Sequence, residues 1–320
     1  GAFLSGGIDS STVVALMQKQ SARPVKTFTI GFTEPEYNEA TFAQDVAKHL
    51  RTDHTEQYVT PREALDVIPK LPAMFDEPFG DSSQIPTFLV SALARQHVTV
   101  SLSGDGGDEL FCGYNRYFDA FRAGSIHRVL PKPVRRFGVR VLAALAARVP
   151  QRQFSQFLWK GTRFLNDDGP EARYIRNLGH WHEAAHLVQG TALPEFLLET
   201  PAKWPAFRHL QERWMLVDTQ TYLTDDILTK VDRASMFVAL EARVPIIDHR
   251  VVEFAWTLPH EFKTDGKTGK QVLRSVLERY VPRALFERPK TGFGVPIEYN
   301  ARTILGAAIG TTVGLFFALP

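Results

Sequence analysis

The chain has 320 residues, of which 44% are hydrophobic and 22% charged, an ordinary composition for a globular protein that is long enough to bury a sizeable core. Lysine and arginine total 37 against 35 acidic residues, so the overall charge does not indicate a polyanionic partner. The single cysteine, Cys112, excludes an internal disulfide and favours a reducing compartment. We therefore expect a cytoplasmic protein that folds as one large domain or two smaller ones.

The two ends of the sequence are unusual. Gly1 stands where a strand should already be running, and no basic segment followed by an apolar stretch marks a secretory signal, so we expect a fragment of a longer chain. Residues 303–320 carry no charge and approach the lower length limit of a membrane-spanning helix, about 17 residues. Glycine, threonine and proline in this stretch weaken that interpretation; the alternatives are a buried helix or an end that is not natural. We expect no membrane span and treat residues 301–320 as an atypical apolar tail.

Segments typical of strands and of helices alternate over residues 1–118. The segments that favour strands by their β-branched and aromatic content are 1–4, 25–32, 54–59 and 98–104. The segments that favour helices are 11–20, 38–50, 61–71 and 86–96, with Asn38 as a plausible cap and Pro61 at a first helical position. This alternation predicts βαβ units, hence an α/β fold with a parallel sheet and helices on both faces.

The strand pattern disappears after about residue 118, and residues 119–300 are predicted to be a helical remainder, helical again over 206–258. Residues 120–165 hold ten lysine or arginine residues and no acid. We interpret this as a solvated basic face. A nucleic-acid interface is the alternative, but no aromatic-interleaved binding motif accompanies the charges, and we expect no nucleic-acid partner.

The first glycine-rich turn, Ser5-Gly6-Gly7-Ile8-Asp9-Ser10-Ser11, follows the first strand. Glycines let the backbone approach an anion, and the next helix offers unpaired N–H groups at its positive dipole end. A carboxylate such as Asp9 should not face phosphate unless a cation lies between them, and Mg²⁺ takes one or two carboxylates together with phosphate oxygens. The turn lacks both the P-loop and the dinucleotide-binding patterns. It therefore predicts a metal-bridged polyphosphate site, against the alternative of a plain strand-to-helix turn.

The second glycine-rich turn, residues 103–109, follows another predicted strand and reads Ser-Gly-Asp-Gly-Gly-Asp-Glu. Its three carboxylates, on Asp105, Asp108 and Glu109, cannot share a small site without a cation or a raised pKa. Ligands of open parallel sheets bind beyond the carboxyl ends of strands, where both turns are expected. We therefore expect Asp9 and Asp108 to share a metal. A solvated loop is the alternative, since the spacing does not match an EF-hand.

Four segments together resemble one family. The first turn is similar to the pyrophosphate-binding loop of N-type ATP pyrophosphatases. In combination with residues 101–117 (SLSGDGGDELFCGYNRY), 228–250 (LTKVDRASMFVALEARVPIIDHR) and 287–297 (ERPKTGFGVPI), it resembles the synthetase domain of glutamine-hydrolysing asparagine synthetases. The resemblance covers residues 1 to about 298 and is weak over 120–205. It implies an adenine-nucleotide α-hydrolase-like core over residues 1–118.

The resemblance also implies a reaction and its partners. The side-chain carboxylate of aspartate attacks the α-phosphorus of ATP, and ammonia then converts the acyl-adenylate to asparagine, releasing AMP. Mg²⁺ is the implied cofactor. The family carries an N-terminal glutaminase domain that supplies ammonia from glutamine; this domain is absent from the present residues, and a homodimer is allowed.

Site residues follow from the matching motif positions. The residues implied for ATP are Leu4, Ser5, Gly6, Gly7, Asp9, Ser10, Ser11, Ile30, Gly31, Ser103 and Gly104, with Leu4, Ile30, Gly31, Ser103 and Gly104 around the adenosine. Asp9 and Asp108 match metal-binding acids, Asp105 a position linked to adenylate formation, and Lys290 a lysine that compensates phosphate charge. Some relatives have glutamate at the position of Asp105. Looser candidates for the amino-acid substrate are Asp81, Ser82, Ser83, Gln84, Glu109 and Arg233.

Three other interpretations remain open. His182 and His186 form an H-E-x-x-H pattern typical of zinc peptidases, with a surface helix as the default. The chain could be a nucleotide-binding module without chemistry. It could also amidate or cyclise a different carboxylate, as relatives in exopolysaccharide, peptidoglycan or β-lactam pathways do.

Overall fold

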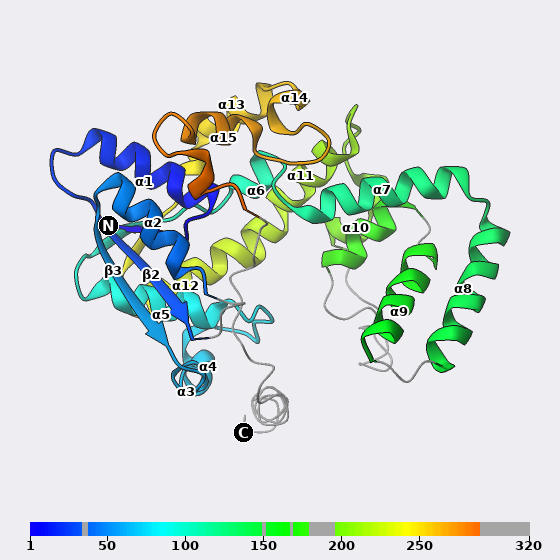
Figure 1. Cartoon of the computed structure of the whole chain (residues 1–320), viewed down its shortest axis with the longest axis horizontal. Helices are drawn as coiled ribbons and strands as arrows, with labels where there is room; N and C mark the ends of the chain where they lie inside the picture. Colours follow the sequence, from blue (N-terminus) through cyan, green and yellow to red (C-terminus); the bar gives the residue numbers. More distant parts are fainter. Residues whose placement is uncertain (34–37, 149–151, 167–168, 179–195, 289–320) are drawn as a thin grey trace. The chain divides into compact units, whose positions relative to one another are not determined.

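The computed structural model describes residues 1–33, 38–148, 152–166, 169–178 and 196–288 (Figure 1). The chain divides into two compact units. The α/β unit comprises Gly1–Gly107, Tyr222–Phe262 and Lys270–Pro320, and the helical unit comprises Asp108–Thr221 and Lys263–Gly269. The domain boundary predicted after residue 118 is not tested by this division and stays a prediction.

The α/β unit is built on a parallel sheet. Its strands are β1 (Ala2–Phe3), β2 (Lys26–Phe32), β3 (Asp53–Val59), β4 (Val100–Leu102) and β5 (Glu241–Arg243). The spatial order is β3-β2-β1-β4-β5, and every neighbouring pair is parallel. The chain winds outward from β1 to β3 and then returns to place β4 on the other side of β1. This reversal creates a switch point between β1 and β4, where ligands of open α/β sheets bind.

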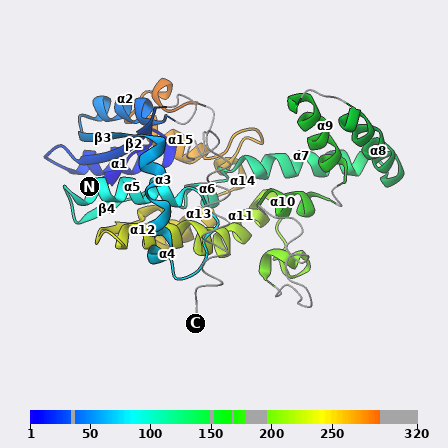
Figure 2. The same ribbon diagram turned by 90° about the horizontal axis from the view of Figure 1, so that it is seen from below.

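Helices cover both faces of the sheet. Their bounds are α1 (Ile8–Gln20), α2 (Ala40–Leu50), α3 (Pro61–Leu65), η2 (Ile68–Lys70), α4 (Leu71–Met74), α5 (Gln84–Arg95), the π-helical η6 (Tyr222–Leu228), α12 (Thr229–Met236), η7 (Pro245–Ile247), α13 (His249–Thr257), α15 (Gln271–Leu277) and η8 (Arg283–Leu285). One core layer joins Ala2 and Leu4 to α1, α2 and α15, and the other joins β2 to α5 and α12. Figure 2 shows the strands between α2 and α12.

Alternation of side chains along the strands explains these layers. In β2, Phe28, Ile30 and Phe32 are at most 2% exposed and point to the layer of α5 and α12. Ala2 and Leu4 point to the opposite layer, that of α1, α2 and α15, while Phe3 between them packs in the layer of α5 and α12. The predicted α/β fold with a parallel sheet is therefore confirmed.

Several predicted elements are confirmed with shifted ends. The side chain of Asn38 accepts from the N–H of Ala40, the first residue of α2. Pro61 begins α3, where Thr60 and Glu63 form a capping box. The prediction of helix throughout 206–258 is wrong at β5, because three residues there pair with β4 and extend the sheet. Glu241 and Arg243 of that strand form an exposed ion pair of 2.7 Å.

The helical unit holds α7 (Asn115–Val129), α8 (Lys132–Arg148), α9 (Arg152–Asn166), α10 (Pro170–Leu178), η4 (Leu197–Glu199), η5 (Pro201–Lys203) and α11 (Leu210–Gln220). Two short helices, α6 (Gly107–Leu110) and α14 (His260–Lys263), lie where the chain passes from one unit to the other. In the hairpin of α8 and α9, a Cβ on Gly138 would lie 3.0 Å from Leu165, and one on Gly161 would lie 3.1 Å from Leu142. These pairs run in opposite directions, so the two helices are antiparallel.

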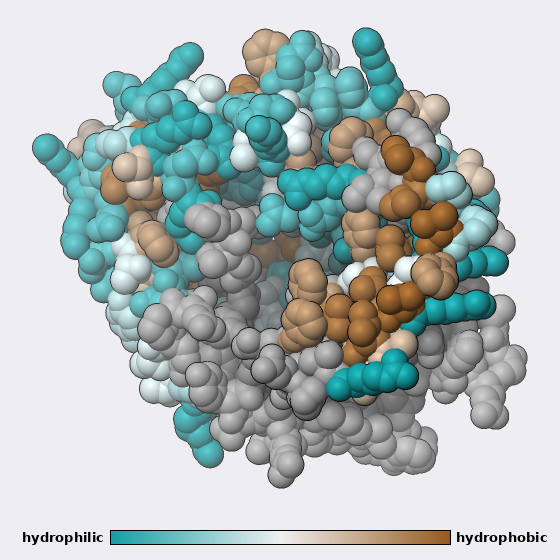
Figure 3. All heavy atoms as spheres, turned by 45° about the vertical axis from the view of Figure 1, so that its right-hand side comes forward, coloured by the Kyte–Doolittle hydropathy of each residue, from teal (hydrophilic) through white to brown (hydrophobic). Residues whose placement is uncertain are grey.

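The hairpin of α8 and α9 also exposes apolar side chains. Those at least 41% exposed are Val134, Phe137, Val141, Leu145, Phe154, Phe157 and Trp159. Figure 3 shows apolar side chains collected over one part of the face that it brings forward. Among the described residues, no helix combines the length and the apolar character that crossing a bilayer requires.

Candidate active site

The first glycine-rich turn forms a tight loop between β1 and α1. Leu4 continues the sheet by donating its N–H to the carbonyl of Phe28 at 2.9 Å. The Ser5 hydroxyl then accepts from the N–H of Gly7 at 3.3 Å and lies 3.0 Å from the Ser10 hydroxyl. The first helical bond runs from the N–H of Ser11 to the carbonyl of Gly7. The N–H groups of the preceding turn lack intrahelical acceptors, as at any helix start, so the loop presents donors at a positive helix end.

Gly6 is required for the shape of this loop. Its φ of +72° lies in the left-handed region, and a Cβ there would lie 2.7 Å from the carbonyl carbon of Phe42 and 2.8 Å from the nitrogen of Ala43. The loop therefore rests directly on the backbone of α2.

The second glycine-rich turn meets the first. A Cβ on Gly104 would lie 2.6 Å from the nitrogen of Ser10, and a Cβ on Gly107 would overlap the carboxylate of Asp9. Side chains at these positions would separate the two turns. The Ser103 hydroxyl donates to the carboxylate of Asp105, which folds that acid back along its own turn. The two turns therefore converge at the switch point between β1 and β4, as their positions after these strands predict.

Asp9 forms an ion pair with Lys270, a residue that sequence analysis missed. Lys270 precedes α15 in a left-handed backbone conformation and is 7% exposed. Its ammonium places a positive charge at the convergence of the two turns. The partners lie 261 positions apart, and no local pattern marks this lysine. Asp108 begins the helical unit, so its predicted pairing with Asp9 stays a prediction.

The residues predicted around adenosine differ in how they could act. Leu4 and Ile30 are 1% and 2% exposed, with side chains in the two core layers. Gly31 follows Ile30 in β2, and a Cβ there would lie 2.8 Å from the side chains of both Ala40 and Asn38. Adenosine contacts at these positions would therefore come from the main chain.

A second polar cluster in the α/β unit contains Asp81. Its carboxylate accepts from the N–H and the hydroxyl of Ser83, at 2.8 and 2.7 Å, and pairs with the buried ammonium of Lys230. Burial alone would raise the pKa of Asp81, but Lys230 and the Ser83 donors outweigh it and lower the pKa to about 2. Burial and the charge of Asp81 raise the pKa of Asp226 to about 6. Asp81 is thus already engaged with its own neighbours.

Other substrate candidates near this cluster are also engaged. Gln84 is 7% exposed and donates to the carbonyl of Phe79 at 3.1 Å, while Arg233 pairs with Asp76 at 2.5 Å. Arg233 remains 46% exposed along its side chain. Ser82 lies between Asp81 and Ser83 in the sequence, just before α5.

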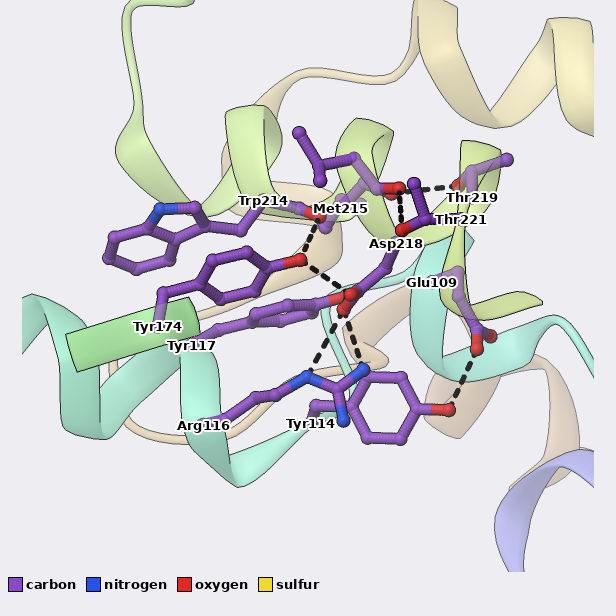
Figure 4. A network of polar contacts seen from close by, with 11 residues as sticks. Glu109, Tyr114, Arg116, Tyr117, Tyr174, Trp214, Met215, Asp218, Thr219 and Thr221 are labelled. Atoms are coloured by element: carbon purple, nitrogen blue, oxygen red, sulfur yellow. Dashed lines mark hydrogen bonds and ion pairs between the residues drawn. The ribbon is translucent and has the colours of Figure 1, made fainter. Parts of the chain in front are cut away.

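Glu109 lies in the helical unit and belongs to a separate polar network (Figure 4). It is 1% exposed and accepts from the hydroxyl of Tyr114 at 2.7 Å. Burial, reinforced by the charge of Asp108, raises the pKa of Glu109 to about 8. Burial therefore favours the neutral form of this carboxyl.

Asp218 is the centre of that network. It is fully buried and accepts from Arg116 at 2.7 Å and from the hydroxyls of Tyr117 and Tyr174. The guanidinium of Arg116 lies 3.6 Å from the centre of the Tyr114 ring. Figure 4 shows these groups converging on Asp218, which fits a charge kept inside the unit by matched donors.

Some predicted site residues lie outside the described part of the chain. They are Lys290 and the histidines of the peptidase-like pattern, His182 and His186.

The described residues are compatible with a Mg²⁺ ion that binds together with the phosphates of its substrate. No cluster of three or more His, Cys, Asp or Glu side chains that could hold a metal is found among them. Mg²⁺ needs no such cluster, because it binds through one or two carboxylates, waters and substrate phosphates. Asp9, at the helix start where a polyphosphate would lie, offers a carboxylate of this kind.

The sheet order and the family match below define a class: an α/β core of the adenine-nucleotide α-hydrolase type. The family model described as "Asparagine synthase" matches residues 1–312. The chain belongs to the asparagine synthase family.

Curated relatives agree with this assignment. The chain is 33% identical over 93% of its length to asparagine synthetase [glutamine-hydrolyzing] 1 of Bacillus subtilis, of which it covers 46%. It is 34% identical over 94% of its length to a putative asparagine synthetase of Mycobacterium bovis, again covering 46%. A putative asparagine synthetase of Methanocaldococcus jannaschii is 46% identical over 43% of the chain and is covered over 27% of its length. The chain thus spans about half the length of the first two relatives.

Proposed function

We propose that this chain is the ATP-activating part of a glutamine-hydrolysing asparagine synthetase. An oxygen of the aspartate β-carboxylate forms a bond to the α-phosphorus of ATP, and the bond to pyrophosphate breaks. Ammonia then attacks the acyl carbon, loses a proton, and AMP leaves with the bridging oxygen. The products are asparagine, AMP and pyrophosphate.

One observation carries this proposal: two glycine-rich turns from adjacent strands converge at the start of α1 with no room for a Cβ at Gly104 or Gly107. Pyrophosphate is the leaving group of adenylation, and a site that holds its charge stabilises the transition state through fixed donors and cations. The proposed donors are the N–H groups at the start of α1 and the hydroxyls of Ser5, Ser10 and Ser11. Among the described residues, Lys270 adds a positive charge beside Asp9.

We assign Mg²⁺ to Asp9 and Asp108, together with phosphate oxygens; the ion would supply further neutralisation of the polyphosphate charge. Lys270 would then release Asp9 toward the ion and turn its ammonium to the phosphates. Asp105 is proposed to assist adenylate formation, and Lys290 to balance phosphate charge as a compact ammonium.

The acceptor would lie beside the cluster of Asp81 and Lys230. Because Asp81, Ser83 and Gln84 already bond to their own neighbours, we assign them to shaping this region. Ser82 and Arg233 are the proposed contacts for the amino or carboxylate groups of the substrate. Glu109 is proposed to support Asp108 from within the helical unit.

The partner that supplies ammonia would be a glutaminase domain. The first two relatives named above are described as glutamine-hydrolysing, and the chain covers 46% of the length of each. We propose that free ammonia supports amide formation by the present residues and that glutamine does not. The cytoplasmic location and a homodimer remain predictions.

The experiment is a substrate screen. ATP–pyrophosphate exchange and AMP release are measured with Mg²⁺, ammonia and a panel of carboxylic acids. Stimulation by aspartate above the other acids supports the proposal. Stimulation only by another acid, such as a uronic acid or a β-amino acid, would assign the chain a different acceptor. Absence of exchange with every acid would contradict ATP activation itself.

A further inference from the structure

Arg288 links the end of the described chain to the first glycine-rich turn. Its Nη2 donates to the main-chain carbonyl of Ser5 at 3.2 Å and to the Glu39 carboxylate at 3.1 Å. Its guanidinium carbon lies 4.2 Å from the centre of the Phe42 ring. All four residues belong to the α/β unit.

These contacts are largely shielded from water. The side chains of Arg288 and Glu39 are 15% and 13% exposed. A charged pair of low exposure interacts more strongly than a surface pair, because water screens it less. The Arg283–Glu287 pair provides a contrast on the same segment, at 3.0 Å but 59% and 37% exposed.

Phe42, which contacts Arg288, also packs against the first glycine-rich turn. The backbone of Phe42 lies where a Cβ of Gly6 would be, so Phe42 touches both the turn and the guanidinium. The Ser5 hydroxyl accepts from the N–H of Gly7 and lies against Ser10. A shift of the Ser5 carbonyl would therefore move the Ser5 hydroxyl and the Gly7 N–H, which belong to the turn proposed to hold pyrophosphate.

We propose that Arg288 is a positioning residue for the pyrophosphate loop: held by Glu39 and Phe42, it fixes the Ser5 carbonyl and thereby the donors of Ser5–Gly7. This inference rests on the proposed function. Arginine suits the task and lysine does not, because a planar guanidinium can stack on a ring while it donates to two acceptors.

The test measures binding of magnesium pyrophosphate by calorimetry, the KM for ATP in aspartate-dependent exchange, and the melting temperature. The variants are Arg288→Lys, Arg288→Gln and Glu39→Gln, and Arg283→Gln is the matched control. We expect both Arg288 variants to weaken pyrophosphate binding and raise the KM for ATP about tenfold. Glu39→Gln should have a smaller effect in the same direction, and Arg283→Gln should have none.

Three results would overturn the inference. In the first, Arg288→Gln lowers the melting temperature but binds pyrophosphate as the wild type does, so the residue is only structural. In the second, Arg288→Lys matches the wild type, so the planar group is not needed. In the third, the wild type binds no pyrophosphate, which overturns the proposed function as well. If Arg288→Gln does not fold, Arg288→Lys decides, since it keeps the positive charge and removes only the planar group that contacts Ser5 and Phe42.

Discussion

The two units of this protein differ in how they pair a carboxylate with positive charge. In the α/β unit, Asp9 and Lys270 form an ion pair where two glycine-rich turns converge. Glycines in the second turn allow its backbone to lie against the Asp9 carboxylate. In the helical unit, Asp218 is fully buried among matched donors of neighbouring helices. In the first arrangement, Asp9 and Lys270 could exchange each other for a cation and a polyanionic ligand. In the second, the donors around Asp218 hold it in one position.

This comparison predicts that substitutions in the first group change catalysis, while those in the second change stability. The predictions below separate the two effects.

Asp9→Asn has the largest expected effect. It keeps the shape of the side chain but removes the charge that pairs with Lys270 and that is proposed to hold Mg²⁺. We expect aspartate-dependent exchange of the folded protein to fall about 1,000-fold. Loss of the charge that pairs with the buried Lys270 should also lower the melting temperature, so the rate is compared per folded molecule. Asp53→Asn, at the exposed beginning of β3, is the control. Near-full activity of the Asp9 variant would remove this residue from the site; the same test applies to Asp108→Asn.

Asp218→Asn should act on folding. It leaves the buried guanidinium of Arg116 without its carboxylate, which should lower the free energy of unfolding by about 3 kcal/mol in urea titrations. The KM for ATP of the folded fraction should not change. Asp119→Asn removes a surface partner of Arg122 and should cost less than about 0.5 kcal/mol. Equal losses in both variants would contradict a special role of the buried network.

Gly107→Ala tests the contact between the two turns. Its Cβ would overlap the Asp9 carboxylate, and displacing a catalytic group by about 1 Å can cost about 100-fold in rate. Gly138→Ala is the control, because its Cβ would meet only the tip of Leu165 in a helix. If exchange by the Gly107 variant stays within a factor of two or so of wild type, the close packing of the turns is not needed.

Over any single pH unit, the smallest expected effect is a pH dependence of stability set by Glu109. The folded protein raises its pKa from 4.5 to about 8, so the folded state binds the proton more tightly than the unfolded state between these values. The free energy of unfolding should therefore fall as pH rises through this window, by at most about 1.4 kcal/mol per pH unit. Glu109→Gln should flatten the slope, whereas Glu253→Gln, exposed on α13, should keep it. An unchanged slope in Glu109→Gln would refute the assignment.

The sequence predicted the fold where local pattern and topology agree. Alternating strand and helix segments gave the parallel sheet, and the two turns were placed together because both follow strands. β5 was missed, since three residues following a helical stretch carry little pattern of their own and are recruited by pairing with β4.

Contacts distant in sequence could not be predicted. Lys270 pairs with Asp9 across 261 positions, and Arg288 reaches Ser5 across 283. Lys270 lies in no motif, and the spacing within the segment 287–297, which contains Arg288, does not indicate a contact with Ser5. The prediction that Asp81 contacts the amino-acid substrate stays a prediction; its ion pair with Lys230 depends on the packing of α12 against α5, which no local pattern indicates.

The most direct test of the account is a crystal structure of the protein with Mg²⁺ and α,β-methylene-ATP. We predict that the β- and γ-phosphates lie against the start of α1, beside the first glycine-rich turn, with the ion in contact with the carboxylate of Asp9. Phosphates bound elsewhere, or an ion that leaves Asp9 paired with Lys270 alone, would contradict it.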